Sequence, residues 1–334
     1  MTAVIPRTED RPANTRPRIG IVLGAGGVLG AAWMTGMLPS LQERLPCALG
    51  DVDVVVGTSA GSVLAAALRC RAGIDEMIAY QRGTSAAMAG RTDLPPVKDG
   101  PLPPIPHFLL GSPALMFTTV LKPHRVHPRV AATALLPRGR GDHAALRAMV
   151  RALHGHAGQQ AAPREPHWVD GRTWIVAVDY ASGRRVVFGR EGAPRAPLPD
   201  AVVASCSIPG WYRPAEINGR HYVDGGVRSL TSLGLMATAG VDEIYVLAPM
   251  ASTAPGHPRG PHEHIERRIR SLFTRGLLRE AGLLRSRGIR VTVLTPGPED
   301  LAAMGVNPMD ARRREAVLDT SLHTSPGSVA RAAS

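Results

Sequence analysis

The sequence predicts an α/β fold in a single domain, with a mainly parallel central sheet flanked by helices. Within residues 1–71, two β-branched apolar stretches, 18–24 and 51–57, each lead through small residues into a helical segment. That order is typical of a parallel sheet. The chain has 334 residues, of which 44% are hydrophobic, enough to bury a large core. No internal repeat and no linker strong enough to define a second domain is visible.

The later elements follow in order. A helical stretch near 75–89 precedes a segment, 92–128, whose prolines exclude long regular elements. The pattern then predicts a helix at 142–155, a hairpin closed by a Ser-Gly turn at 173–189 and an Asn-Gly turn at 218–219. A strand at 242–249, a helix of mixed charge at 261–287 and a last strand at 289–296 follow. Residues 1–17 predict a disordered tail and 325–334 a loose tail, which leaves 18–324 as the folded domain.

The uncharged stretch 21–41 is long enough to raise the question of a transmembrane helix. Four glycines lie within residues 24–30, a composition that suits a tight backbone turn better than a membrane helix. A strand, a glycine loop and a buried helix therefore account for this stretch better.

The composition limits which classes of partner and cofactor are expected. The formal charge of +12 raises the question of an anionic partner, yet only Lys98 and Lys122 are lysines among 39 basic residues, a bias that points to codon usage as much as to function. Aromatic residues make up only 4%, so no nucleic acid is expected. The isolated Cys47, Cys70 and Cys206 predict buried thiols in a reducing, cytoplasmic compartment, and neither a metal site nor a cofactor is expected.

Ser59 stands at a sharp transition from strand to helix, in the sequence VVVGTSAGS. A serine at such a turn adopts a strained backbone conformation, and the small Gly57 and Gly61 allow the two elements to approach closely. The helix N-terminus favours a developing negative charge, which suits a nucleophile. The alternative is that Ser59 is a helix N-cap, a position in which serine is common.

The glycine-rich loop after the first strand matches no nucleotide-binding motif. A P-loop needs Gly-Lys-Ser/Thr, and neither lysine has that context. A dinucleotide fingerprint that starts at Gly24 would need glycine in place of Leu29. What is left is a run of backbone N–H groups from Gly26, Gly27 and Val28, closed by Gly30, which is how an oxyanion hole is built.

Asp224 is the candidate base for Ser59. It ends an apolar strand in YVDGG, where Gly225 and Gly226 free the backbone, although an aspartate before glycine also commonly caps a turn. A Ser-His-Asp triad would instead use a late histidine. The four candidates have no distinguishing context: His257, His262, His264 and His323.

Taken together, these motifs resemble the patatin-like phospholipases. The resemblance rests on the glycine loop, GTSAG, SCSIPGWYRP at 205–214 and the downstream DGG, in the family's order. It implies a three-layer α/β sandwich, a lipid acyl-ester substrate and a Ser59–Asp224 dyad without histidine, with an acyl-enzyme and an oxyanion hole in loop 24–28. The chain departs from the family at Leu29, where many members have arginine, and at VRSLTSLGL after DGG.

The expected function is therefore hydrolysis of lipid or phospholipid esters. The alternatives are a general esterase or acyltransferase with a triad, a nucleotide-binding protein, and a non-catalytic protein of the membrane surface. Residues 100–121, within a Pro-rich cover at 100–130, carry an apolar face expected to form a lid or acyl-channel wall, or else a packed covering layer. That face consists of Phe108, Leu109, Leu110, Leu115, Met116 and Phe117. Arg125 and Arg129, just beyond it, predict weak peripheral attraction to an anionic membrane.

Overall fold

A computed structural model describes residues 16–84, 107–160, 168–253 and 261–333. Its central sheet has the strand order β10-β9-β1-β2-β5-β8-β7, with β6 also paired to β5. The pairs from β10 through β5 are parallel, whereas β6, β7 and β8 form antiparallel pairs at the other end. The strands are β1 Ile19–Leu23, β2 Val54–Thr58, β5 Arg172–Asp179, β6 Arg185–Phe188, β7 Ala215–Ile217, β8 Arg220–Asp224, β9 Glu243–Leu247 and β10 Arg290–Leu294.

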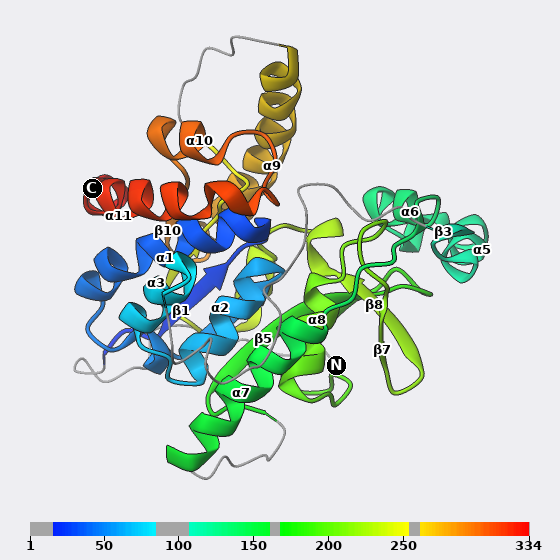
Figure 1. The fold of residues 1–334 in the computed structure, drawn as a ribbon, viewed down its shortest axis with the longest axis horizontal. Helices are drawn as coiled ribbons and strands as arrows, with labels where there is room; N and C mark the ends of the chain where they lie inside the picture. The colour runs from blue at the N-terminus through cyan, green and yellow to red at the C-terminus, as the bar shows by residue number, and fades with distance from the viewer. Residues whose placement is uncertain (1–15, 85–106, 161–167, 254–260, 334) are drawn as a thin grey trace.

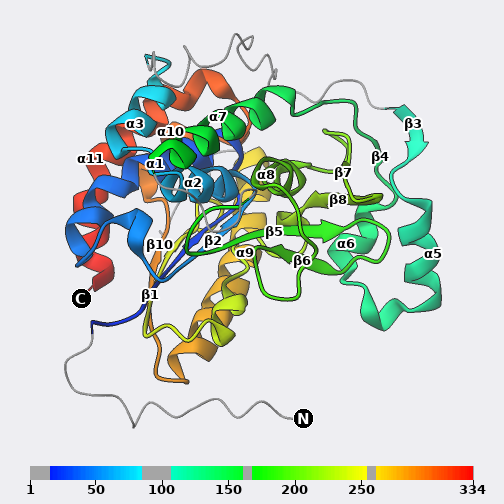
Figure 2. The ribbon, with the colours of Figure 1, turned by 90° about the horizontal axis from the view of Figure 1, so that it is seen from below.

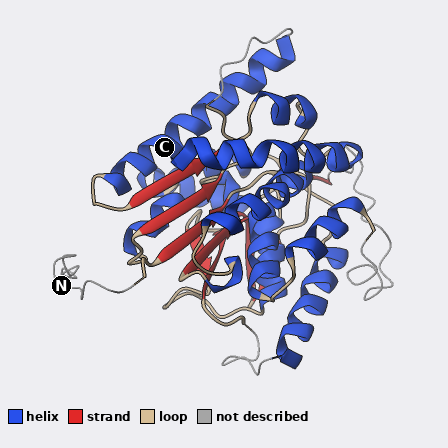
Figure 3. Cartoon of the chain, turned by 90° about the vertical axis from the view of Figure 1, so that its left-hand side faces the viewer, coloured by secondary structure: helices blue, strands red, loops and turns tan. Residues whose placement is uncertain are grey.

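Helices cover both faces of this sheet, as Figures 1 to 3 show. Alternate strand residues explain why: Ile19, Ile21 and Leu23 pack with one set of helices, whereas Val22 packs into a second core on the other face. The first set is α1 Gly27–Arg44, α2 Ala60–Arg69, α3 Ile74–Arg82, α7 Ala144–Gln160, α8 Leu198–Cys206, α10 Pro298–Met304 and α11 Arg314–Ala333. The second face is covered by the short helix η5 Leu233–Thr238 and by α9 Pro261–Arg285, which lies below the sheet in Figure 2. The expected α/β fold is thus confirmed.

The hairpin expected at 173–189 is the β5–β6 pair, and the Asn-Gly turn connects β7 to β8. Asn218 and Gly219 adopt φ values of 51° and 69°, a region in which asparagine and glycine are the least strained residues.

The C-terminal expectation was wrong in one respect. Residues after 325 were expected to form a loose tail, but they continue α11 to Ala333, and Ser325 is buried. The Ser321 hydroxyl donates to the Trp33 carbonyl at 2.8 Å, and the Ser40 and Ser325 hydroxyls lie 2.8 Å apart. Packing along α1 therefore stabilises a helix that contains Pro326. The expected N-terminal tail lies outside the described residues, apart from 16 and 17.

The Pro-rich segment is more regular than expected over its described part. It contains β3 His107–Leu110, α5 Pro113–Leu121, α6 Pro128–Thr133 and β4 Pro137–Arg138. These elements lie together at the edge of the molecule beyond β8 (Figure 1). Across the described part of the chain, no helix combines the length and apolarity needed to cross a membrane.

This segment is partly a covering layer. Leu115, expected on the lid face, is fully buried among Val126, Val130 and Val223, which corrects that expectation. Phe117 has 68% of its surface exposed. The side chains of Phe108, Leu109 and Leu110, and residues 100–106, lie outside what the structure describes.

Candidate active site

Ser59 lies in a strained turn between β2 and α2. Its backbone has φ 54° and ψ −123°, a combination that L-residues rarely adopt. The turn is tight because a Cβ on Gly61 would stand 2.0 Å from the Leu23 carbonyl oxygen, and one on Gly57 would stand 2.6 Å from the Gly61 oxygen. Ser59 occupies the N-cap position of α2, but its side chain makes no capping hydrogen bond, so the hydroxyl does not cap the helix.

Two neighbouring serines position this turn. The Ser59 N–H donates to the Ser205 Oγ at 2.9 Å, and the Ser205 hydroxyl donates in turn to the Val176 carbonyl at 2.6 Å. The Ser62 hydroxyl donates to the Ser59 carbonyl at 2.6 Å. The Ser59 backbone is therefore held from both sides, and its own hydroxyl is left for another partner.

Asp224 lies at the end of β8, almost completely buried. Its N–H donates to the Ser207 carbonyl at 2.9 Å, and its Oδ1 accepts from the Gly226 N–H at 2.6 Å. Oδ2 is buried without a hydrogen-bond partner among the described residues. Burial raises the pKa of this carboxyl to about 6, an effect that the nearby Ser59 hydroxyl and the hydrogen bond from the Gly226 amide oppose. A carboxylate with this pKa can accept a proton near neutral pH.

The sheet register brings Ser59 and Asp224 to the same place. Thr58, just before Ser59, pairs with Val176, and Asp224 pairs with the next residue, Ala177, along the same edge of β5, because β6 pairs with both residues along the other edge. The Cys206 thiol lies in the same cluster, and burial together with the Asp224 charge raises its pKa to about 12. Cys206 therefore stays a protonated thiol, and Ser59 is the better candidate nucleophile.

The glycine loop offers three unused amides. The N–H groups of Gly24, Ala25 and Leu29 donate to Leu247, Leu230 and Pro308 carbonyls, at 2.9, 2.7 and 3.0 Å. Those of Gly26, Gly27 and Val28, at the N-terminus of α1, donate no hydrogen bond to any described residue.

This loop contacts both halves of the candidate site. Gly61 lies against Leu23 and Gly24, and a Cβ on Gly226 would stand 3.2 Å from that of Ala25. The loop that carries the three free amides therefore lies beside the segments that hold Ser59 and Asp224.

Comparison with known proteins identifies a family for this chain. A model of the patatin-like phospholipase family matches residues 21–233. The chain belongs to that family. The resemblance seen in the sequence is thereby confirmed, and it supports the expected enzyme class, a hydrolase of lipid esters.

Individual relatives are distant from this patatin-like chain. Uncharacterized NTE family proteins of Mycobacterium tuberculosis and Mycobacterium bovis are 26% identical over 271 residues, which cover 81% of this chain and 58% of each relative. The chain thus matches little more than half the length of these relatives.

Three solved structures are similar at low scores. VipD from Legionella pneumophila has a TM-score of 0.39 at 12% identity, covering 92% of this chain and 67% of that one. The type III effector ExoU has a TM-score of 0.33 at 15% identity, covering 95% of this chain and 53% of that one. Human GIVD cytosolic phospholipase A2 has a TM-score of 0.38 at 13% identity, covering 95% of this chain and 58% of that one.

Both departures from the family pattern have a structural counterpart. Leu29, which replaces the family's arginine, is fully buried in the main core, so no side-chain charge lies at that position. After DGG, the divergent stretch supplies the Leu230 carbonyl that holds the Ala25 amide. The divergent residues therefore position the glycine loop.

The four late histidines gain no support as a base. The exposed side chains of His264 and His323 lie on α9 and α11, whereas residue 257 and the side chain of His262 fall outside the described residues. The sequence analysis missed His143, whose Nε2 lies 3.1 Å from the Cys206 carbonyl and whose ring stacks on Tyr212 at 3.9 Å. No local motif marks it, because the contact depends on how α7 packs on α8. Within the described part, no group of His, Cys, Asp and Glu has the arrangement of a metal site.

Proposed function

We propose that this protein hydrolyses carboxylic esters of lipids through a Ser59–Asp224 dyad and an acyl-enzyme. The observation that carries the proposal is the pairing of a strained serine, whose hydroxyl caps no helix, with a buried carboxylate that has one unpartnered oxygen. Membership of the patatin-like phospholipase family supports the lipid ester as substrate.

The reaction runs in two halves. The Ser59 Oγ attacks the ester carbonyl carbon while its proton moves to Asp224, and the amides of Gly26, Gly27 and Val28 donate to the oxyanion. Collapse of this intermediate breaks the bond to the alcohol, which leaves with the proton from Asp224. Water then attacks the acyl-enzyme, passes a proton to Asp224, and releases the fatty acid as the Ser59 oxygen regains its proton.

The same enzyme is proposed to work at a lipid surface, with α5 as the contact. Phe117, Val120 and Leu121 on this helix have 68%, 79% and 59% of their surface exposed. Lys122 and Arg125 follow directly, so apolar side chains and positive charge lie on one small part of the chain. That combination suits shallow insertion into an anionic membrane surface.

The proposed function is tested by assaying purified protein on a series of esters, from short soluble to long-chain lipids. Ser59→Ala is expected to abolish hydrolysis of all of them. Ser232→Ala is the matched control, because Ser232 is also a buried serine at positive φ, 55°, with an unpartnered hydroxyl. Undiminished hydrolysis in Ser59→Ala would refute the assignment.

A further inference from the structure

A cavity of about 180 Å³ adjoins the candidate active site. Ala25 of the glycine loop and residues 228–231, just after Asp224, form one wall. α9 contributes Leu272 and Phe273, and His127 and Arg129 come from the start of α6. A substrate ester held between Ser59 and the glycine loop therefore has this cavity as its neighbour.

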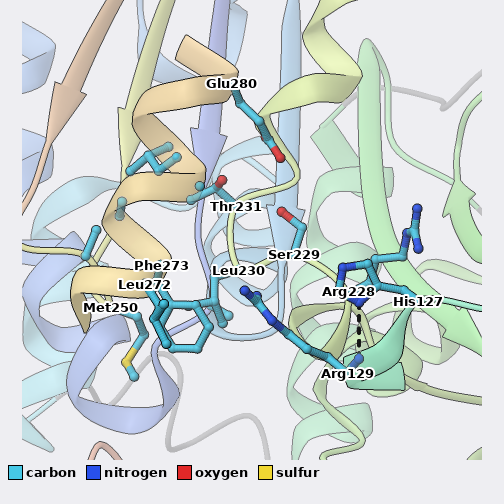
Figure 4. A pocket seen from close by; sticks show the side chains of 15 residues that line it. His127, Arg129, Arg228, Ser229, Leu230, Thr231, Met250, Leu272, Phe273 and Glu280 are labelled. Carbon is cyan, nitrogen blue, oxygen red and sulfur yellow. Dashed lines mark hydrogen bonds between the residues drawn. The ribbon is translucent and has the colours of Figure 1, made fainter. Parts of the chain in front are cut away.

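The two sides of the cavity differ in character. Figure 4 shows Met250, Leu272 and Phe273 on one side and His127 and Arg228 on the other, with the Arg129 side chain extending between them. The Arg129 Cζ lies 5.2 Å from the centroid of the Phe273 ring, which keeps the guanidinium over the cavity.

The polar side carries positive charge that no described carboxylate neutralises. Neither guanidinium, of Arg129 or of Arg228, forms an ion pair with a described residue. Burial and the nearby Arg228 lower the pKa of Arg185, an effect that Glu280 opposes and Arg190 reinforces. Burial, Arg228 and Arg129 likewise lower the pKa of His127.

One acidic side chain lines the cavity, and it is engaged elsewhere. The Glu280 Oε2 accepts from the Gly234 N–H at 2.8 Å, and Figure 4 shows its side chain apart from both arginines. The Ser229 and Thr231 side chains lie between them in that view. Like charges gathered without counter-ions favour the binding of an anion.

We propose that this cavity binds the phosphate group of the lipid substrate's head group. Arginine guanidinium groups match phosphate oxygens in geometry and charge. The volume of about 180 Å³ is below the range of about 300–1,000 Å³ usual for drug-sized ligands, so it fits a small polar head better than a long acyl chain. The assignment rests on the proposed function, because the head group belongs to the ester that Ser59 attacks.

The phosphate site is tested first without catalysis, in Ser59→Ala protein titrated calorimetrically with glycerol 3-phosphate. Arg129→Gln and Arg228→Gln are each expected to weaken binding by at least about tenfold, the loss typical of a charge-assisted hydrogen bond. Arg275→Gln removes the same charge from an exposed arginine of α9 outside the cavity and is expected to bind normally. No binding, or equal weakening in Arg275→Gln, overturns the proposal. Melting temperatures without ligand show that each variant is folded.

The lipid arm compares phosphatidic acid with diacylglycerol of the same acyl chains, in neutral detergent micelles. In the Arg129→Gln and Arg228→Gln variants the ratio of kcat/KM for phosphatidic acid over diacylglycerol is expected to fall by about tenfold, and in Arg275→Gln to stay constant. If glycerol 3-phosphate binds as expected but the ratio does not change, the site serves a free phosphate compound and the head-group role is wrong. If neither lipid is hydrolysed by the wild type, the proposed function fails, whereas the calorimetric result still decides the phosphate site.

Discussion

Ser59 and Asp224 come together along one edge of strand β5, where the end of β2 faces the end of β8. Thr58, before Ser59, pairs with Val176, and Asp224 pairs with Ala177, although the two site residues are far apart in the chain. β6 pairs with Val176 and Ala177 along the other edge of β5, so β2 and β8 share one edge, and Ser59, which follows Thr58, reaches the level of Ala177 at which Asp224 lies. The dyad's geometry is thus a property of the sheet register.

The pH dependence of the reaction follows from the buried base. The Asp224 pKa is raised to about 6, and the carboxyl must be ionised to accept the Ser59 proton. We expect kcat/KM for a soluble ester to rise with pH and to reach half its plateau near pH 6. His143→Gln is the control, and the acid limb is expected to persist in it. If kcat/KM instead reached half its plateau near pH 4, the ordinary pKa range of a carboxyl, the result would contradict a raised pKa at Asp224.

Stability and activity are expected to separate at Asp224. Because its pKa is raised, the folded state holds the proton more tightly than the unfolded chain between about pH 4 and 6, so the folded state loses stability as pH rises through that window. Asp224→Asn removes the buried charge and is expected to raise the free energy of unfolding at pH 8 by up to about 3 kcal/mol, while abolishing hydrolysis.

Urea denaturation at pH 8 and pH 4 measures this effect. The increase in the free energy of unfolding caused by Asp224→Asn is expected to vanish at pH 4, where the wild-type carboxyl is also neutral. An Asn variant that is equally destabilised at both pH values would show that the carboxylate is a structural group.

Much of this site could be predicted from the sequence because its signals are local. The elbow around Ser59 depends on Gly57 and Gly61, and the oxyanion amides depend on glycines at the start of a helix, all visible within a few residues. Asp224 could not be assigned from local signals alone, because only the order of the motifs along the chain linked it to Ser59.

The remaining features depend on packing between distant segments. Arg129 meets Phe273 because the fold brings the start of α6 near α9, and His143 reaches Cys206 because α7 packs on α8. α11 continues through Pro326 because its hydroxyls bond to α1, an effect that local proline statistics do not contain. Such contacts have no signature in a single sequence.

Ser205 is expected to act as a positioning residue. Its hydroxyl accepts from the Ser59 N–H and donates to the Val176 carbonyl, so Ser205→Ala frees the strained turn. We expect kcat to fall by roughly tenfold to a hundredfold with KM nearly constant, as for a misplaced catalytic group.

Ser207→Ala is the matched control for this change. Ser207 is equally buried, but its hydroxyl donates to the Val203 carbonyl within the same helix. Kinetics of both variants on one soluble ester make the comparison. Equal losses in the two would mean that Ser205 acts only through general packing.

Membrane contact through α5 is tested by Phe117→Ser. The side chain is 68% exposed, so the melting temperature is expected to stay constant while hydrolysis of vesicle-presented lipid falls and that of a short soluble ester does not. Leu115→Ser, at a fully buried position of the same helix, is expected instead to cost several kcal/mol of stability, of order 3. A Phe117→Ser variant with unchanged activity on anionic vesicles contradicts the proposed contact.

The most direct test of the dyad is to trap the acyl-enzyme position with a fluorophosphonate and to map the adduct by mass spectrometry. The account predicts one adduct, on Ser59, formed quickly in the wild type and slowed by several orders of magnitude in Asp224→Asn. Ser232→Ala is expected to label as the wild type does. An adduct on another serine, or labelling of Ser59 at an unchanged rate in Asp224→Asn, would contradict the central claim that these two residues act together.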